Sequence, residues 1–246
     1  MTMTPDRTLV PEPAHQPEIN CTLPRIEDAA RRSRLFLATE FLVLFIGLPV
    51  SLFFRLAGQL PPLPLLWAVA LYCLVVLLRD PTFDRGQLWN AGPLRSQLPQ
   101  LLGLFASGVV IVTLLIHQYA PNLLLALPRK QPLLWAIIMV GYPVLSVLPQ
   151  GLIYRAFFFH RYRTLVAFAP ATRSWIMILA SGATFALMHI VFHNWIALAL
   201  TFPGGILFAL RYCNTRSMAV SSLEHALYGC FLFTIGLGEF FYVRVV

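Results

Sequence analysis

The sequence predicts an all-α membrane protein, a polytopic transmembrane helix bundle of seven or eight helices with an intramembrane polar chamber. Two observations predict the membrane bundle. Of the 246 residues, 58% are hydrophobic and only 11% are charged, whereas soluble domains carry about 25% charged residues. The apolar residues also form runs close to the roughly 20 residues that a helix needs to cross a bilayer. A water-soluble enzyme is therefore excluded, and the lipid bilayer is the first expected partner of the chain.

Seven apolar runs are long enough, or nearly so, to span a membrane. In chain order they cover Leu35–Phe54, Leu63–Leu78, Leu98–Ile116, Leu133–Leu148, Trp175–Phe192, Trp195–Leu210 and Met218–Leu237. The fourth run could extend beyond Leu148, and the last could break at Gly236 or Gly238 to leave a short eighth helix. In the sixth run, Gly204 and Gly205 predict close packing between helices.

The segment before these runs is polar, with prolines at positions 5, 11, 13, 17 and 24. We predict a flexible cytoplasmic tail over 1–34 and one transmembrane helical domain over 35–246. If the seven runs alternate in direction, 14 of the 18 basic residues lie on the side that holds the N-terminus. The positive-inside rule then places the N-terminus in the cytoplasm. The net charge of +8 is explained by contact with the inner leaflet and does not indicate a nucleic-acid partner.

Three segments in the second half of the chain carry polar or ionisable groups among apolar residues. They are Gln150–Arg155, Phe185–His189 and Glu224–His225. An ionisable group inside a hydrophobic span costs about 2.5–3.5 kcal/mol or more, so such groups face the bundle interior and usually carry function. Together the three segments predict one polar chamber that contains an active site.

The stretch Leu148–Arg163 has two interpretations. Its aromatic and basic residues are interleaved, which is typical of an amphipathic helix at the membrane surface with Phe157–Phe159 in the lipid. Alternatively, the fourth span continues through Gln150 with kinks at its prolines. With the shorter span, Gln150 and His189 lie near opposite membrane faces, about 20 Å apart. A shared site therefore requires the longer fourth helix or a later start of the fifth.

His189 and His193 are four residues apart and would share one face of a helix that continues through both. Zinc sites use this spacing, usually with a further carboxylate or cysteine ligand. A divalent metal such as zinc on these two histidines is therefore an alternative to a histidine that lines the bundle and hydrogen-bonds to another helix. We expect no other cofactor, because the sequence has no glycine-rich phosphate loop and no dinucleotide fingerprint.

Glu224 and His225 are adjacent, so on a helix their side chains point about 100° apart. One of them can face the chamber while the other faces a neighbouring helix. Glu224 is either a catalytic base or half of a structural ion pair, for example with Arg155. Glu40, in the first run, lies in no motif, and we interpret it as a carboxylate that faces the bundle or reaches the membrane surface.

These segments resemble the motifs of the CAAX-prenyl-endopeptidase and bacteriocin-processing family, also called CPBP or Abi. The family pattern is Glu-Glu-x-x-x-Arg, then Phe-x-x-x-His, then His-x-x-x-Asn, on successive membrane helices. Here Phe185–His189 matches the second motif, Arg155 the arginine of the first, and His225 the histidine of the third. The resemblance covers about 133–237, which is the expected protease-like core.

The resemblance implies a hydrolase that cleaves peptides within or beside the membrane. In the family a glutamate activates water, the histidines position that water, and the asparagine helps to hold the oxyanion. The two glutamates fall here on Gln150 and Gly151, and the asparagine falls on Gly229. Glutamine cannot accept a proton as a general base and glycine has no side chain, so Glu224 becomes the candidate base. A natural loss, a sequence variant and an engineered inactivation each account for Gly151.

Three functions remain. The first is an intramembrane endopeptidase that resembles CAAX-processing proteases and acts on a hydrophobic or prenylated peptide. Its candidate catalytic residues are His189, His225, Glu224, Arg155, Gln150 and Gly151. The alternative is a catalytically inactive relative that serves as a membrane scaffold or binding protein. The third is a carrier or metal-handling protein that uses His189, His193, His225 and Glu224.

Overall fold

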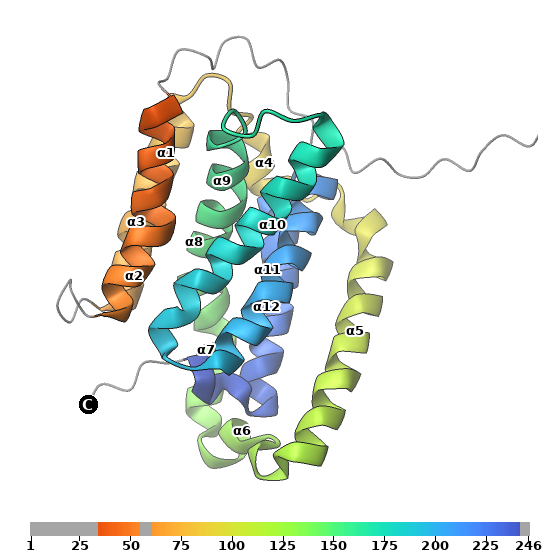
Figure 1. The fold of residues 1–246 in the computed structure, drawn as a ribbon. Coiled ribbons are helices and arrows are strands. Elements are labelled where there is room, and N and C mark those ends of the chain that lie inside the picture. Colours follow the sequence, from red (N-terminus) through yellow and green to blue (C-terminus); the bar gives the residue numbers. More distant parts are fainter. Residues whose placement is uncertain (1–33, 55–60, 242–246) are drawn as a thin grey trace, which may run out of the picture.

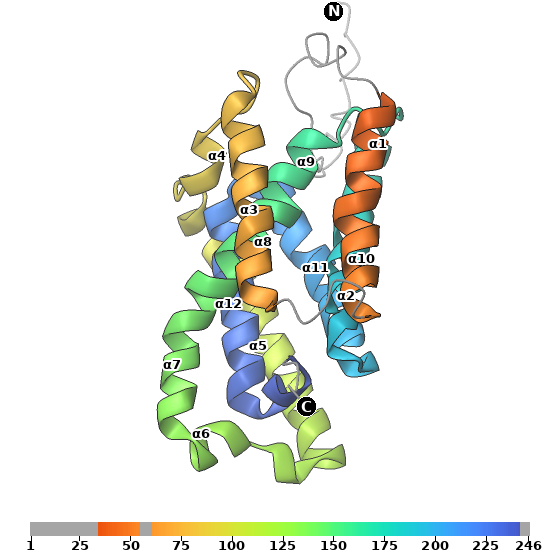
Figure 2. The same cartoon turned by 90° about the vertical axis from the view of Figure 1, so that its left-hand side faces the viewer.

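The computed structural model describes residues 34–54 and 61–241. Of the predicted tail over 1–34, all but Arg34 lies outside the described residues. Within the described ranges every regular element is a helix, and seven helices are long and apolar enough to cross a membrane. The predicted fold class is therefore confirmed. The long helices run roughly parallel to one axis and form an elongated bundle (Figure 1, Figure 2).

The elements of the first half are α1 (Arg34–Leu42), η2 (Val43–Gly47), α2 (Leu48–Phe53), α3 (Pro62–Arg79), α4 (Gly86–Trp89), α5 (Leu94–Tyr119), η3 (Pro121–Leu123) and α6 (Ala126–Lys130). Those of the second half are α7 (Pro132–Tyr142), η4 (Pro143–Val147), α8 (Leu148–Gly151), η5 (Leu152–Phe157), α9 (Phe158–Arg161), α10 (Pro170–Met188), η6 (His189–Phe192), α11 (Trp195–Thr215), α12 (Met218–Ile235) and η7 (Leu237–Phe241). The segments η2, η4 and η5 are π-helical, and η3, η6 and η7 are 3₁₀ helices. Helices α1 to α2 form the first span and α7 to α9 form the fourth.

The fourth span runs unbroken from Pro132 to Arg161, so it extends beyond Leu148, as the second of the two interpretations predicted. A proline interrupts the backbone ladder because it has no N–H to donate. The helix continues through Pro143, which begins the π-helical segment η4, and through Pro149 in the short α8. Single π-helical turns of this kind occur inside α-helices and are one of the recognised sites at which a helix bends.

The longer fourth span decides between the two interpretations of its C-terminal half. The rings of Phe157, Phe158 and Phe159 are buried in the protein, so this stretch is not an amphipathic helix in the lipid. Arg155 is also buried inside the span, whereas the count of basic residues had placed it in a loop. Apolar side chains exposed on the outer faces of α3, α5 and α7 are available to contact lipid instead.

An aromatic cluster joins the first span to the fourth. The ring of Phe45 lies edge-on to the rings of Tyr154, Phe158 and Tyr162, with centroids 5.3–5.7 Å apart. Edge-to-face aromatic pairs contribute about 0.5–1.5 kcal/mol each beyond the area that they bury. This packing holds the C-terminal half of the fourth span in the centre of the bundle.

Helices α10 and α11 pack closely through two glycines. A Cβ atom at Gly205 would lie 2.9 Å from the Cα of Gly182, so neither position has room for a side chain. The predicted role of Gly205 in helix packing is confirmed. The neighbouring Gly204 instead lines a cavity, where a Cβ would make only ordinary contact with Phe208.

Side-chain caps fix where the last two spans begin. Asn194 Oδ1 accepts a hydrogen bond from the N–H of Ala197 at the start of α11, and Ser217 Oγ accepts one from Val220 at the start of α12. At the other end, α12 stops at Gly236, whose φ of +113° suits glycine. The chain then forms only the five-residue η7, so the described residues hold no eighth span.

A buried ion pair fastens the end of the fourth span to the first. Arg161 donates from Nε to Glu40 Oε2 at 2.7 Å and from Nη2 to Glu40 Oε1 at 2.9 Å. Both side chains are about 5% exposed. The expectation that Glu40 faces the bundle is confirmed.

The same end of the protein holds Asp80. Burial raises the pKa of its carboxyl, but hydrogen bonds from Thr82 and His160 leave that pKa below its ordinary value.

Replacing Glu40 with alanine should strongly destabilise the bundle, because Arg161 would remain buried without its carboxylate. We expect a loss of about 3–5 kcal/mol in the free energy of unfolding, as for other broken buried pairs. Denaturant titration in detergent micelles measures it. Glu239→Ala, at an exposed acid, is the control and should leave stability unchanged. A Glu40→Ala variant as stable as the parent would contradict the structural role of this pair.

Candidate active site

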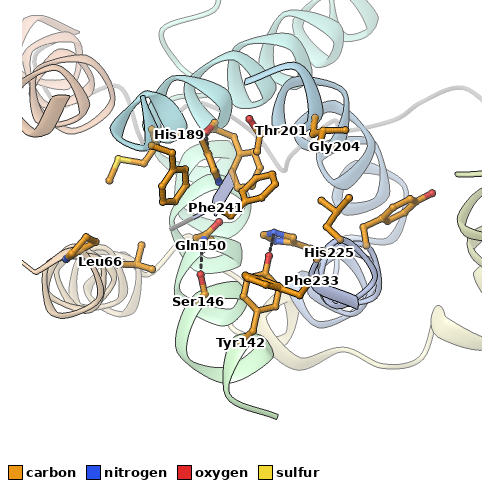
Figure 3. Close-up of a pocket in the computed structure, with 18 of the residues that line it drawn as sticks. Leu66, Tyr142, Ser146, Gln150, His189, Thr201, Gly204, His225, Phe233 and Phe241 are labelled. Carbon is orange, nitrogen blue, oxygen red and sulfur yellow. Dashed lines mark hydrogen bonds between the residues drawn. The ribbon is translucent and has the colours of Figure 1, made fainter. Parts of the chain in front are cut away.

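One cavity of about 950 Å³ lies between the spans. Its walls come from the end of α2, the start of α3, the middle of α5, the fourth span and the last three spans. Figure 3 shows that His189, Gln150 and His225 surround its centre from three different spans. Most of the remaining wall is apolar, which suits a hydrophobic ligand.

His189 lies where α10 changes into the 3₁₀ turn η6. Its Nδ1 lies 2.7 Å from the carbonyl oxygen of Phe185. A carbonyl can only accept, so Nδ1 carries the proton of this bond. In a neutral imidazole the other nitrogen, Nε2, then carries the lone pair. His189 therefore offers the cavity a proton acceptor whose ring is held in place by the backbone of its own helix.

His225 faces the cavity from α12. Its ring stacks on Phe208 at a centroid distance of 4.6 Å and meets Phe185 edge-on at 5.4 Å. The ring of Phe185 also lies 4.7 Å from the ring of His189. One phenylalanine ring thus lies against both histidines, so the second and third motifs do share a site.

The longer fourth span brings Gln150 to the same cavity, which resolves the distance that separated it from His189 in the shorter span. Gln150 donates from Nε2 to Ser146 Oγ at 2.7 Å. Its Oε1 is buried and has no hydrogen-bond partner within the described residues. This oxygen is therefore an unpaired acceptor within the wall of the site.

Gly151 is buried against α12. A Cβ atom at this position would overlap Ser222 Oγ and lie 3.4 Å from Cγ of Met218. Ser222 Oγ is itself buried without a hydrogen-bond partner among the residues described. The space beside Gly151 is therefore filled by a serine hydroxyl, which has to move before a side chain can be added there.

Arg155 lies behind the cavity wall, with only 2% of its surface exposed. Its Nη1 donates to Ser181 Oγ at 3.0 Å, and its guanidinium carbon lies 5.2 Å from the ring centre of Phe185. No carboxylate in the described part of the chain forms an ion pair with it. Arg155 thus supports Phe185, and through it the two histidines, without lining the cavity.

Glu224 is turned away from the cavity. Both of its carboxylate oxygens accept hydrogen bonds from Arg211, at 2.9 and 3.0 Å, and the side chain is fully buried. Arg211 also donates to Gln97 and Gln100 on α5. The ion-pair interpretation of Glu224 therefore has a geometric basis, although its partner is Arg211 and not Arg155.

His193 does not share a helical face with His189. The α-helix ends at Met188, and His193 adopts a left-handed conformation with φ of +55°. Its ring stacks on Phe53 with centroids 4.5 Å apart. In the part of the chain that the structure describes, no three His, Cys, Asp or Glu side chains are grouped so that they could hold a metal ion. The argument for a zinc site assumed that His189 and His193 share one face of a continuous helix, and in the structure they do not.

Comparison with known families gives a match to a segment in the second half of the chain. Residues 129–231 match the family described as type II CAAX prenyl endopeptidase Rce1-like. This segment is Rce1-like. The match confirms the resemblance seen in the three motifs, and the Rce1-like segment contains Gln150, His189 and His225. No curated protein and no solved structure matches the chain.

Two residues that line or support the site escaped the sequence analysis, Tyr142 and Ser222. Tyr142 lines the cavity, and its hydroxyl lies 3.2 Å from Nε2 of His225. Both fill space beside a glycine at which the family pattern has a larger residue, since a Cβ at Gly229 would overlap Tyr142. Gly151 and Gly229 could have indicated these two neighbours from the sequence. A close-packed interior has to replace the side-chain volume that a glycine leaves empty.

The contact between Gly151 and Ser222 predicts a matched pair of variants. Gly151→Ala should lower the free energy of unfolding by about 1–3 kcal/mol, as overpacking usually does. Adding Ser222→Ala should recover most of this loss, because the two Cβ positions are 3.7 Å apart. Denaturant titration of both variants in detergent tests this. Equal stability of Gly151→Ala and the parent chain would show that the two residues are not in contact.

Proposed function

We propose that this protein is an intramembrane endopeptidase that cleaves a hydrophobic or lipidated peptide with water activated by histidine. One observation carries the proposal: His189 and His225 lie against the same Phe185 ring and both line a large apolar cavity within an Rce1-like segment. The cavity supplies room for an apolar chain, and the imidazoles supply the chemistry.

His189 is the proposed general base. Its Nε2 lone pair takes a proton from water, and the resulting hydroxide attacks the carbonyl carbon of the peptide bond. The same proton then passes to the nitrogen of the leaving amine. Histidine is the residue that most often performs this transfer, with a typical contribution of 10²- to 10⁴-fold in rate.

A histidine base is needed because no described residue that lines the cavity is an aspartate or a glutamate. We leave Glu224 out of the proposed catalytic group, since Arg211 already binds both of its oxygens. Gln150 takes an orienting role, because it lines the cavity with an amide whose Oε1 has no hydrogen-bond partner in the described residues. Arg155 is a positioning residue that acts through Phe185.

The missing carboxylate also supports a second candidate function, a relative that binds a hydrophobic or prenylated peptide and does not cut it. The same cavity serves both functions. They differ in whether the histidines can activate water without a carboxylate. A binding protein would retain the peptide intact, and its affinity would depend on the apolar wall more than on His189.

The orientation of the chain bears on where the substrate enters. We propose a cytoplasmic N-terminus, because the sequence segments expected on the N-terminal side of the membrane carry most of the basic residues. The cavity includes Leu52 near the end of α2, Pro62 at the start of α3 and His193 directly after η6. These residues lie at the end of the bundle opposite the start of α1. In this orientation, a substrate reaches the cavity from the non-cytoplasmic half of the membrane.

Replacing His189 with glutamine should lower kcat by about 10²- to 10⁴-fold, because the general base is lost. The assay follows cleavage of a C-terminally prenylated peptide, and of its unprenylated form, by purified protein in liposomes. His193→Gln is the matched control, since His193 lines the cavity from the same chain segment, and it should retain activity. Cleavage that survives in His189→Gln would remove His189 as the base. Binding of peptide without any cleavage by the parent chain would favour the second candidate.

The proposed orientation predicts which end of α10 a membrane-impermeant thiol reagent can reach. In intact cells His193→Cys should be labelled, whereas Arg173→Cys should be labelled only after permeabilisation. The unmodified chain, with its own four cysteines, measures the background. The reverse pattern would place the N-terminus outside the cytoplasm and the cavity mouth toward it.

A further inference from the structure

The side chain of Tyr142 occupies the space that Gly229 leaves open. A Cβ atom built at Gly229 would overlap both the ring and the hydroxyl of Tyr142. Tyr142 is the last residue of α7, directly before the π-helical segment η4, and Gly229 lies on α12. The two helices thus meet where one has no side chain and the other has a large one.

The hydroxyl of Tyr142 is held beside a histidine of the site. It lies 3.2 Å from Nε2 of His225, as Figure 3 shows. The tyrosine ring also packs edge-on against Phe233, with centroids 5.2 Å apart. Tyr142, His225 and Gly229 all line the cavity, so this hydroxyl is fixed in direction and lies at the cavity wall.

We infer that the Tyr142 hydroxyl is the oxyanion donor of this site, in the place where the family pattern has an asparagine at position 229. The inference rests on the proposed endopeptidase function. A phenol carries one O–H donor and can accept a hydrogen bond on the same oxygen. When Nε2–H of His225 donates to the Tyr142 oxygen, the phenolic proton is free to donate into the cavity.

With Tyr142 as the oxyanion donor, every bond formed and broken in peptide hydrolysis can be assigned. The water oxygen bonds to the peptide carbonyl carbon while its proton goes to Nε2 of His189. The carbonyl π electrons move to the carbonyl oxygen, which accepts the hydrogen bond from Tyr142. When the carbonyl reforms, the C–N bond breaks and the proton on His189 goes to the amine nitrogen. Tyr142 keeps its own proton throughout.

The second filled glycine position does not offer the same role. Ser222 fills the space beside Gly151, but Ser222 does not line the cavity. Of the two hydroxyls that occupy lost side-chain volume, only the Tyr142 hydroxyl reaches the site. Arg155 is also excluded as the donor, because it lies behind Phe185 and outside the cavity lining.

Tyr142→Phe tests the role of the hydroxyl with little change in volume. We expect kcat for the prenylated peptide to fall by about 10²- to 10³-fold, as when other oxyanion donors are removed, with KM nearly unchanged. Tyr119→Phe is the matched control, because it removes an exposed phenol hydroxyl outside the cavity lining, and it should retain activity. A Tyr142→Phe variant within threefold of the parent kcat would overturn the inference and leave the histidine mechanism in place.

A pair of size-exchanged variants separates chemistry from packing. Gly229→Asn alone should misfold or lose thermal stability, because the asparagine would overlap Tyr142. Tyr142→Ala/Gly229→Asn frees that space and restores an amide donor, so it should exceed Tyr142→Ala in kcat by at least about tenfold. Equal kcat values in these two folded proteins would count against an oxyanion role at this place. If the parent chain itself binds the peptide and never cleaves it, the proposed function fails, and this inference fails with it.

Discussion

Hydrocarbon offers no hydrogen-bond partner to a backbone N–H or C=O group, and this constraint keeps the fourth span helical through two prolines. The span contains Pro143 at the start of the π-helical segment η4 and Pro149 in the short α8, and it continues to Arg161. Everything at the site depends on that continuity. It brings Gln150 to the cavity wall and buries Arg155 behind that wall. A fourth span that ended at Leu148 would leave the two histidines without these partners.

The buried charges are divided between structure and chemistry. Glu40 pairs with Arg161, and Glu224 pairs with Arg211. The first pair joins the first span to the fourth, and the second joins the consecutive helices α11 and α12. Breaking either pair would leave a charge unsatisfied in the interior. Because these acids are already neutralised, the described cavity lining contains neutral hydrogen-bonding side chains in place of carboxylates. The chemistry available there is that of imidazole, amide and phenol groups.

The two glycines in the motif positions are not holes in the structure. Ser222 fills the space beside Gly151, and Tyr142 fills the space beside Gly229. Interiors pack to nearly constant density, so a lost side chain is replaced by a neighbour or leaves a costly cavity. In this protein the first replacement only fills volume, whereas the second also brings a hydroxyl next to His225. This chain has therefore lost two side chains of the family pattern, and neighbouring side chains occupy the space that they would have filled.

The sequence alone determined the membrane class, the seven spans and the motif order, because hydropathy and residue spacing are local properties of the chain. It also indicated that Glu224 and His225 face different ways, since adjacent helical residues must diverge by about 100°. Only the tertiary structure decided that the fourth span continues, that Glu224 pairs with Arg211, and that Tyr142 stands beside Gly229. These outcomes depend on which faces of distant helices meet. That choice is made by the packing of the whole bundle, and no local pattern encodes it.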